Sequence, residues 1–436
     1  ALPILRFFGD IKNDNNMLSI AGVSAKVLAK EYGTPLYIMD EQLIRDNCRR
    51  FYKSLKVKSE HNKVAYAGKA FLTIAMCEII KSEGLYLDVV SGGELYTAYK
   101  AEFPLENIYF HGNNKTIDEI KMAIDLGVGT FVVDNLHEMK IINENAKEKG
   151  ITQQIILRVT PGIEAHTHDY IKTGQIDSKF GFTILNNELE EVIRTALGLS
   201  NIKLAGLHCH IGSQIFELEP YREAVNIMTT LIKHIKEKFS YDIEELDLGG
   251  GFGVYYDKGD EPKEIEEFCS VILEEAKARC IKYGIKLPII VIEPGRSIVA
   301  NAGITLYTVG AIKDIPEVRK YVAVDGGMTD NIRPALYNAQ YQCLLANRIS
   351  DPCTEIVTIA GKCCESGDIL LEGVKLPKIN SGDLMAVLST GAYGYSMSSN
   401  YNKIPKAPVV LVNDGSHKII CKRQTYKDMI SNEVCL

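Results

Sequence analysis

Residues 64–90 read VAYAGKAFLTIAMCEIIKSEGLYLDVV, and this stretch points to the fold class. It contains two short apolar runs, 64–67 and 86–90, with a longer amphipathic stretch between them. Short apolar runs of this length are typical of buried strands, and an amphipathic stretch is typical of a helix that packs on them. The stretch therefore predicts one strand–helix–strand unit of an α/β protein.

The same alternation recurs along the chain. Six further apolar runs lie at 108–110, 130–133, 155–159, 204–208, 245–248 and 289–292. Helical patterns lie between them, and in residues 220–239 the side chains of Val225, Met228 and Ile232 share one face. Eight such repeats over about 230 residues predict a TIM-type (β/α)8 barrel. An open doubly wound sheet has the same local rhythm and stays an alternative.

The pattern changes after Gly303. Short apolar runs, split by Gly, Pro, Asn and Asp, now come close together at 304–312, 321–324, 355–359, 384–388, 409–412 and 418–421. This pattern predicts an antiparallel β-barrel or β-sandwich domain at the C-terminal end. The first 32 residues do not fit the barrel rhythm. We therefore expect residues 33–302 to form the barrel domain, and 1–32 with 303–436 to form a β-rich domain that contributes to the substrate pocket and to dimerisation.

Composition excludes several classes of protein. The 436 residues are 46% hydrophobic and carry 49 basic against 56 acidic side chains, a net charge of −7. A globular chain without a basic block is not expected to bind nucleic acid or an anionic membrane. Eleven cysteines without a C-x-x-C pair argue against a disulfide framework and a structural zinc site. With no signal-peptide pattern in the first residues, we expect a cytoplasmic location.

Unusual polar residues fall where the predicted strands end. They are Lys69, Asp88, His208 with His210, the glycines Gly249, Gly250 and Gly251, and the run from Glu293 to Arg296. In a (β/α)8 barrel the carboxyl ends of the strands share one face, which carries the active site. The sequence therefore predicts that these residues meet at one mouth of the barrel.

Two of these features suggest particular chemistry. Three consecutive glycines leave backbone N–H groups unshielded at a helix start, which suits a phosphate group, although a plain tight turn explains them equally well. Lys69 lies among small apolar residues, where a desolvated amine can form a Schiff base; the alternative is a solvated lysine at a strand edge. A phosphate cradle, a reactive lysine and a buried carboxylate together indicate pyridoxal phosphate.

The pairs His166/His168 and His208/His210 have the i, i+2 spacing that could place two imidazoles on one side of a strand. Neither pair has a third ligand at a characteristic spacing, so we expect no metal. We interpret His210 instead as a ring stacked on a planar cofactor, with Ser213 in the next turn as a phosphate donor.

Seven motifs carry a resemblance to a known family. They are AYAGKA at 65–70, DVVSGGEL at 88–95, HCHIGSQ at 208–214, DLGGGFG at 247–253, EPGRS at 293–297, CESGD at 364–368 and GAYGYSMSSNYN at 391–402. With these motifs in this order, the chain resembles the fold-type III pyridoxal-phosphate decarboxylases of the alanine-racemase-like superfamily, and among them the branch that acts on meso-2,6-diaminopimelate.

The resemblance implies a role for each matching residue. Lys69 would hold the cofactor covalently, Glu293 would pair with the pyridine nitrogen, and His210 would stack on the ring. Asp88 and Glu94 would orient the lysine side of the pocket. The phosphate would be held by a larger set: Ser213, Gly249, Gly250, Gly251, Gly295, Arg296 and Tyr393.

The resemblance also implies the reaction, the decarboxylation of meso-2,6-diaminopimelate to L-lysine as the last step of lysine biosynthesis. Cys364 would protonate the α-carbon; the alternative is that it is a small buried hydrophobic residue. The substrate would be bound by Arg296, Arg333, Tyr337, Glu365, Tyr393 and Tyr401. A homodimer with shared active sites follows, because in the family the loop at Cys364 reaches the partner's pocket. The alternatives are a decarboxylase of ornithine, arginine or carboxynorspermidine, and a catalytically silent homologue.

Overall fold

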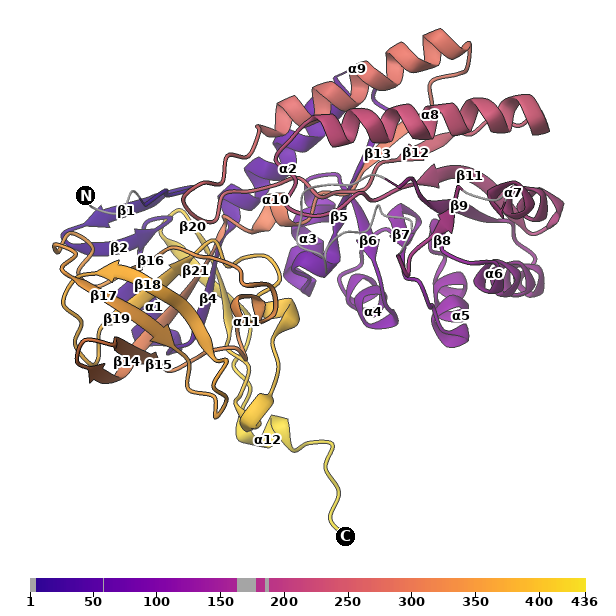
Figure 1. Ribbon diagram of the computed structural model, residues 1–436. Helices are drawn as coiled ribbons and strands as arrows, with labels where there is room; N and C mark the ends of the chain where they lie inside the picture. Colours follow the sequence, from indigo (N-terminus) through magenta and orange to yellow (C-terminus); the bar gives the residue numbers. More distant parts are fainter. Residues whose placement is uncertain (1–4, 58, 163–177, 185–187) are drawn as a thin grey trace. The chain divides into compact units, whose positions relative to one another are not determined.

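The computed structural model describes residues 5–57, 59–162, 178–184 and 188–436 (Figure 1). It divides into two compact units. We call residues 47–254 with 261–297 the barrel unit, and residues 1–46, 255–260 and 298–436 the β-rich unit.

Eight parallel strands form the barrel unit. They are β5 (Lys63–Ala67), β6 (Tyr86–Val89), β7 (Ile108–Phe110), β8 (Thr130–Val133), β9 (Gln153–Thr160), β11 (Ile202–His208), β12 (Glu245–Asp247) and β13 (Ile289–Ile292). The sheet closes on itself, because β13 pairs with β5 and β8 pairs with β9. A short extra strand, β10 (Phe182–Thr183), pairs with β9. The predicted (β/α)8 barrel is thus confirmed, and the open doubly wound sheet is excluded.

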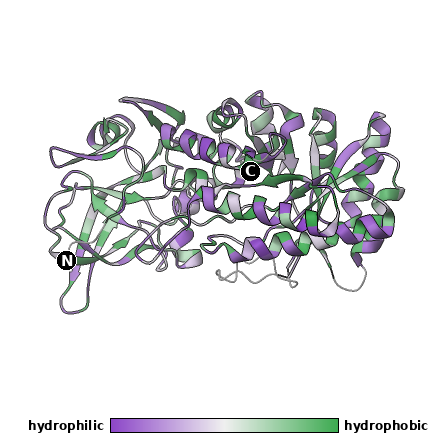
Figure 2. Cartoon of the chain, turned by 90° about the horizontal axis from the view of Figure 1, so that it is seen from above, coloured by the Kyte–Doolittle hydropathy of each residue, from purple (hydrophilic) through white to green (hydrophobic). Residues whose placement is uncertain are grey.

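Helices follow the strands on the outside of the barrel (Figure 1). They are α2 (Glu41–Lys56), which starts in the β-rich unit, α3 (Ile74–Ser82), α4 (Gly92–Lys100), α5 (Ile117–Leu126), α6 (Leu136–Lys149), α7 (Glu188–Gly198), α8 (Glu219–Phe239), α9 (Ile265–Tyr283) and the short α10 (Arg296–Val299). In α8 the predicted apolar face, with Val225, Met228 and Ile232, is buried. Figure 2 shows the helices in alternating bands of hydrophilic and hydrophobic residues, as expected when one side of each helix packs on the strands.

The barrel interior is a packed core and not a pore. Small and β-branched side chains from different strands meet there, among them Ala65, Val132 and Val291. At the amino-terminal end of the strands the hydroxyl of Tyr109 donates a hydrogen bond to Glu245 over 2.8 Å, and Lys63 pairs with the same carboxylate. The polar side chains at this end therefore pair with one another.

The described residues of the β-rich unit form two sheets. The strands β1 (Ile11–Asp14), β2 (Met17–Ile20) and β3 (Val23–Ser24) form a small antiparallel sheet. A nine-stranded sheet contains β4 (Leu36–Asp40), β14 (Gly303–Ile315), β15 (Arg319–Val324), β16 (Cys343–Leu345), β17 (Glu355–Ala360), β18 (Ile369–Leu376), β19 (Leu384–Leu388), β20 (Val409–Asn413) and β21 (Ser416–Cys421). The helices of this unit are α1 (Ala25–Tyr32), α11 (Arg333–Tyr337) and α12 (Tyr426–Met429).

All six predicted C-terminal strands are present in this sheet, while β16 and β18 were not foreseen. Most neighbouring strands are antiparallel, as predicted, but β15 pairs in parallel with β17, and β4 with β20. The sheet packs on an apolar core that includes Leu28, Leu306 and Val410.

The division into units differs from the expected domain boundaries at 33–46, 255–260 and 298–302, which belong to the β-rich unit. The strand β4 explains the first difference. It lies between β14 and β20 in the nine-stranded sheet, so its backbone hydrogen bonds join it to strands that come more than half the chain later. Among the described residues, no helix is both long and apolar enough to cross a membrane.

Candidate active site

Ionisable side chains gather at the carboxyl ends of the barrel strands. They are Lys69 after β5, Asp88 on β6, His111 after β7, Arg158 on β9, His208 on β11, Asp247 on β12 and Glu293 after β13. All except Lys69 are buried. Burying so many ionisable groups costs folding free energy, and such clusters occur mainly at functional sites. This mouth of the barrel is therefore the candidate site.

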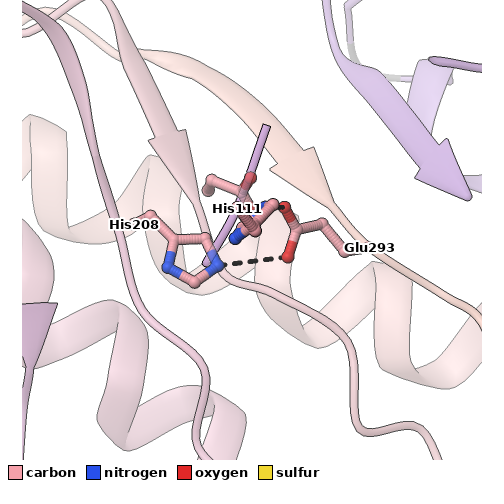
Figure 3. A group of neighbouring side chains, drawn as sticks. His111, His208 and Glu293 are labelled. Atoms are coloured by element: carbon pink, nitrogen blue, oxygen red, sulfur yellow. Dashed lines mark hydrogen bonds and ion pairs between the residues drawn. The ribbon is translucent and has the colours of Figure 1, made fainter. Parts of the chain in front are cut away.

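Glu293 contacts two histidines of this group (Figure 3). Its Oε1 atom lies 2.5 Å from Nε2 of His111, and its Oε2 atom lies 3.1 Å from Nε2 of His208. The two imidazole rings meet edge to face, with centroids 4.8 Å apart. The carboxylate is therefore held between two rings that come from different strands.

Burial determines the charge of these two rings. It lowers the pKa of His111 well below its ordinary value, and it lowers the pKa of His208 to about 4. Both imidazoles are therefore neutral near neutral pH. A neutral imidazole that faces a carboxylate donates its N–H, so each ring donates a hydrogen bond from Nε2 to Glu293.

Two further carboxyl groups lie deep in the cluster. Burial raises the pKa of Asp88 to about 7 and raises the pKa of Asp247 well above its ordinary value. Within the described part of the chain, Oδ1 of Asp88, Oδ2 of Asp247 and Nδ1 of His208 have no hydrogen-bond partner. Buried polar atoms without partners are rare in folded proteins, and a bound cofactor is one way to satisfy them.

The donor set His111, His208, Asp247 and Glu293 also has the composition of a metal site, with donor atoms within 4.8 Å of one another. Ligands of a tetrahedral zinc ion are about 3.3 Å apart, given metal–ligand bonds of about 2.0–2.1 Å. The 2.5 Å separation between His111 and Glu293 is that of a hydrogen bond instead. His210 does not join this set, and His166 and His168 lie outside the described residues.

Lys69 lies on a short 3₁₀ turn, Gly68–Ala70, directly after β5. The sequence predicted a desolvated amine, but the residue is exposed. Burial raises the pKa of the carboxyl groups of Asp88, Glu94 and Glu293. The positive charge of Lys69 lowers these pKa values and partly offsets that rise. Glu94 also accepts a hydrogen bond from the backbone N–H of Val90 over 2.7 Å, so its orientation is fixed near the lysine.

The glycine run follows β12. Gly249 and Gly251 have φ values of 67° and 92°, which favour glycine, and a Cβ atom at Gly250 would lie 2.2 Å from the carbonyl oxygen of Glu293. The expectation that a helix begins here is wrong, because α9 begins only at Ile265. The glycines therefore allow a tight loop to pass close to the end of β13.

Arg296 and Ser213 meet beside this loop. The buried guanidinium of Arg296 donates a hydrogen bond from Nη2 to Oγ of Ser213 over 2.9 Å. Nδ1 of His210 accepts a hydrogen bond from the backbone N–H of Gly250 over 3.3 Å. A Cβ atom at Gly295 would lie 2.9 Å from Cβ of Ala67, so the loop after β13 also packs closely on β5. Four predicted phosphate-binding elements are thus neighbours in the barrel unit: Ser213, the glycine run, Gly295 and Arg296.

The β-rich unit holds a second unusual group around Arg333, the first residue of α11. Its guanidinium lies 5.7 Å from the ring centroid of Tyr256, 5.4 Å from that of Tyr337 and 5.7 Å from that of Tyr393. Its Nε atom donates a hydrogen bond to the hydroxyl of Tyr341 over 2.9 Å. Arg333 is only 8% exposed, yet none of the described carboxylates forms an ion pair with it. A buried cation without a counter-ion is suited to bind an anion.

The loop with Cys364 and Glu365 lies in the same unit. Both residues are exposed, while the neighbouring Cys363 is buried. The turn is fixed because Asp368 accepts a hydrogen bond from the backbone N–H of Cys363 over 2.8 Å, and Asn402 accepts one from Cys364 over 2.7 Å. Cys364 is therefore not the small buried hydrophobic residue of the alternative interpretation. Tyr401 is also exposed, at 44%.

Sequence reasoning missed several members of both groups. They are His111, Arg158 and Asp247 in the barrel unit, and Tyr256 and Tyr341 in the β-rich unit. His111 and Asp247 had the same signal as Asp88, a polar residue at the end of an apolar run. The two tyrosines had no such signal, because only the fold brings them to Arg333.

Comparison with known proteins defines the class. Residues 41–300 match the family model described as the pyridoxal binding domain of pyridoxal-dependent decarboxylases. The chain therefore belongs to the pyridoxal-dependent decarboxylases, and its cofactor is pyridoxal phosphate.

Relatives within that family narrow the comparison to diaminopimelate decarboxylases. The enzyme of that name from Bacillus subtilis (strain 168) is 49% identical, over 96% of this chain and 95% of its own. The one from Bacillus methanolicus is also 49% identical, over 99% of this chain and 100% of its own. A crystal structure of diaminopimelate decarboxylase from m. jannaschii, in complex with L-lysine, is similar with a TM-score of 0.92 and 35% identity, and covers 99% of both chains.

Proposed function

We propose that this chain decarboxylates meso-2,6-diaminopimelate to L-lysine and carbon dioxide, the last step of lysine biosynthesis. The single observation that carries the substrate assignment is Arg333, a buried cation with no ion-pair partner among the described carboxylates. Diaminopimelate has a second carboxylate at its distal end, whereas ornithine and arginine have none. A substrate without this group would leave the guanidinium buried and uncompensated, which is costly.

The barrel residues fit the cofactor. Glu293, with two neutral imidazoles as hydrogen-bond donors, is suited to accept a hydrogen bond from the ring nitrogen. Lys69, exposed at the end of β5, would hold the cofactor through its amine, and its charge reaches the carboxyl groups of Asp88 and Glu94. His210 would stack on the ring. When bound, pyridoxal phosphate supplies a sink for the electrons that remain when carbon dioxide departs.

The phosphate would be bound by a set of hydrogen-bond donors from the loops after β11, β12 and β13. In the barrel unit these are Ser213, the backbone of Gly251 and the Gly295–Arg296 backbone. The N–H groups of Gly249 and Gly250 already donate to Asp247 and His210, so these two glycines would serve by letting the loop approach the phosphate closely. We add the hydroxyl of Tyr393 from the β-rich unit, on the strength of the family motif. Backbone N–H groups and an arginine are the donors that phosphate groups prefer.

The distal end of the substrate would be bound by residues of the β-rich unit. The guanidinium fork of Arg333 can pair with a carboxylate through two parallel hydrogen bonds, with Tyr337 packed on its face. Glu365 and Tyr401 would bind the distal ammonium and its carboxylate, and Tyr393, whose ring centroid lies 5.7 Å from the guanidinium of Arg333, would complete the set. These roles separate the two ends of the substrate, so that only one carboxylate is placed to leave.

Cys364 would protonate the α-carbon, since its thiol is exposed and its loop is fixed by Asp368 and Asn402. We also propose that the chain forms a homodimer in which this loop serves the partner's site. All eleven cysteines are free, which supports a cytoplasmic location where thiols stay reduced.

Separate assays of four substrates test the proposed reaction. The cofactor-loaded protein receives meso-diaminopimelate, ornithine, arginine or carboxynorspermidine, and carbon dioxide and the amine product are measured for each. Lysine from diaminopimelate alone supports the proposal. Turnover of another amine would overturn the role of Arg333, and no turnover at all would favour a catalytically silent homologue.

Mixing two inactive variants tests the shared sites. Lys69→Ala lacks the amine, and Cys364→Ala lacks the thiol. If the loop acts across the dimer, mixed dimers regain one intact site out of two and the mixture recovers activity. If each chain supplies its own loop, the mixture stays as inactive as its components.

A further inference from the structure

The hydrogen bonds around Glu293 assign a role to a residue that no family motif in the sequence contains. We propose that His111 is a positioning residue, which holds the carboxylate of Glu293 ionised and oriented toward the ring nitrogen of the cofactor. The proposal rests on the role given above to Glu293. It goes beyond that role because it names the group that makes Glu293 able to perform it.

The geometry gives Glu293 a fixed orientation. Each of its two oxygens accepts one imidazole N–H, from His111 over 2.5 Å and from His208 over 3.1 Å (Figure 3). His111 directly follows β7 and His208 ends β11, and these two strands are not neighbours in the barrel. The carboxylate therefore cannot rotate without breaking at least one of these bonds.

The neutral charge of His111 matters as much as its position. The groups around it are Asp88, Glu293, His208, Asp247, Arg158 and Lys115. Burial lowers the pKa of His111 well below its ordinary value, so the ring donates a hydrogen bond without bringing a positive charge. A lysine or arginine at this position would neutralise Glu293. A neutral donor stabilises the carboxylate of Glu293 without cancelling its negative charge. That charge can then pair with the protonated ring nitrogen of the cofactor.

His111 is better placed for this task than His208. Its contact with Glu293 is shorter, and its Nε2 atom is also 3.8 Å from Oδ1 of Asp88, an atom with no hydrogen-bond partner in the described chain. The ring thus lies between two buried carboxyl groups. It therefore contacts Asp88, whose pKa burial raises to about 7, while it donates to Glu293.

Three variants test the proposal. His111→Phe keeps a ring of similar size but removes the donor, and His111→Gln keeps an N–H donor close to the position of Nε2. His137→Phe, at an exposed histidine of α6, is the matched control. For each variant we would measure the dissociation constant of pyridoxal phosphate from the cofactor-free protein, the ¹⁵N chemical shift of the labelled ring nitrogen, and the thermal midpoint of the cofactor-free protein.

His111→Phe removes a hydrogen bond to a charged group, so we expect it to weaken cofactor binding by about 10- to 100-fold. The ¹⁵N chemical shift should move toward that of the unprotonated ring. His111→Gln should recover most of both, and His137→Phe should change neither. An unchanged dissociation constant and ¹⁵N shift in His111→Phe would overturn the proposal. So would equal losses in both His111 variants with a lower thermal midpoint, because that pattern indicates a purely structural role. Since no substrate is present, failure of the decarboxylation assay would leave these results intact.

Discussion

Replacing Arg333 by methionine is the perturbation that most directly tests the substrate assignment. Methionine is unbranched, fills irregular gaps and packs well on aromatic rings, so it should occupy much of the space between Tyr256, Tyr337 and Tyr393 while removing the charge. The expected loss is therefore that of the interaction with the distal carboxylate and not of the local fold.

The size of the loss follows from the burial of Arg333, which is 8% exposed. Two unit charges about 4 Å apart at an effective dielectric constant of about 20 attract by about 4 kcal/mol, and a net hydrogen bond to a charged group contributes about 1.5–3 kcal/mol. A net loss of about 3–4 kcal/mol corresponds to a fall in kcat/KM of about 150- to 1,000-fold. Most of it should appear in KM, because the distal end is bound equally before and during the reaction.

The assay is steady-state release of carbon dioxide from meso-diaminopimelate, with the cofactor dissociation constant measured in parallel. Arg319→Met is the matched control, since Arg319 is an exposed arginine of β15 that pairs with Glu372. It should leave kcat/KM unchanged. A fall of less than about threefold in Arg333→Met, or an equal weakening of cofactor binding, would refute the reasoning and make Arg333 a structural residue.

Three further outcomes are expected. Lys69→Ala should lose both the visible absorbance of the lysine-bound cofactor and all turnover; retained turnover would contradict the mechanism. Burial lowers the pKa of His208 from its ordinary 6.5 to about 4, so between these values only the unfolded chain takes up the proton. Protonation of His208 in the unfolded chain should therefore lower the free energy of unfolding on acidification, by up to about 3 kcal/mol over the whole interval. Urea titrations of the cofactor-free protein at pH 7 and pH 4.5 measure this loss, which should be smaller in His208→Gln. Gly250→Ala should cost about 3 kcal/mol or more of stability, because its Cβ would lie 2.2 Å from the carbonyl oxygen of Glu293, whereas Gly198→Ala, with open space around it, should be harmless.

Much of the fold could be predicted because the barrel strands are covered on both sides. A strand such as β13 (Ile289–Ile292) is then apolar throughout and easily distinguished from the amphipathic helices. β4 was missed as part of the β-rich unit because local sequence does not reveal a partner that comes hundreds of residues later. β16, with three residues, is too short for its pattern to be recognised.

Part of the candidate site could also be predicted, since Asp88 and Glu293 interrupt or end apolar runs. The rest depends on spatial arrangement. His111 and Asp247 have the same local signal, but only the closed barrel shows that their side chains gather around Glu293. The exposure of Lys69 could not be foreseen either, because its neighbours in sequence are small and apolar while its side chain leaves them at the 3₁₀ turn.

The position of β4 constrains the order in which the chain can fold during synthesis. The barrel unit lies between β4 and its partners in sequence, so a growing chain emerges from the ribosome with β4 first, then the whole barrel, and only later residues 303–306 and 409–412. Until β14 is made, both edges of β4 lack hydrogen-bond partners and can pair with strands of other nascent chains. The barrel can complete its own closure in that interval, because β5 to β13 are already present. Chains interrupted between residues 297 and 303 should therefore contain a folded barrel and an aggregation-prone N-terminal strand.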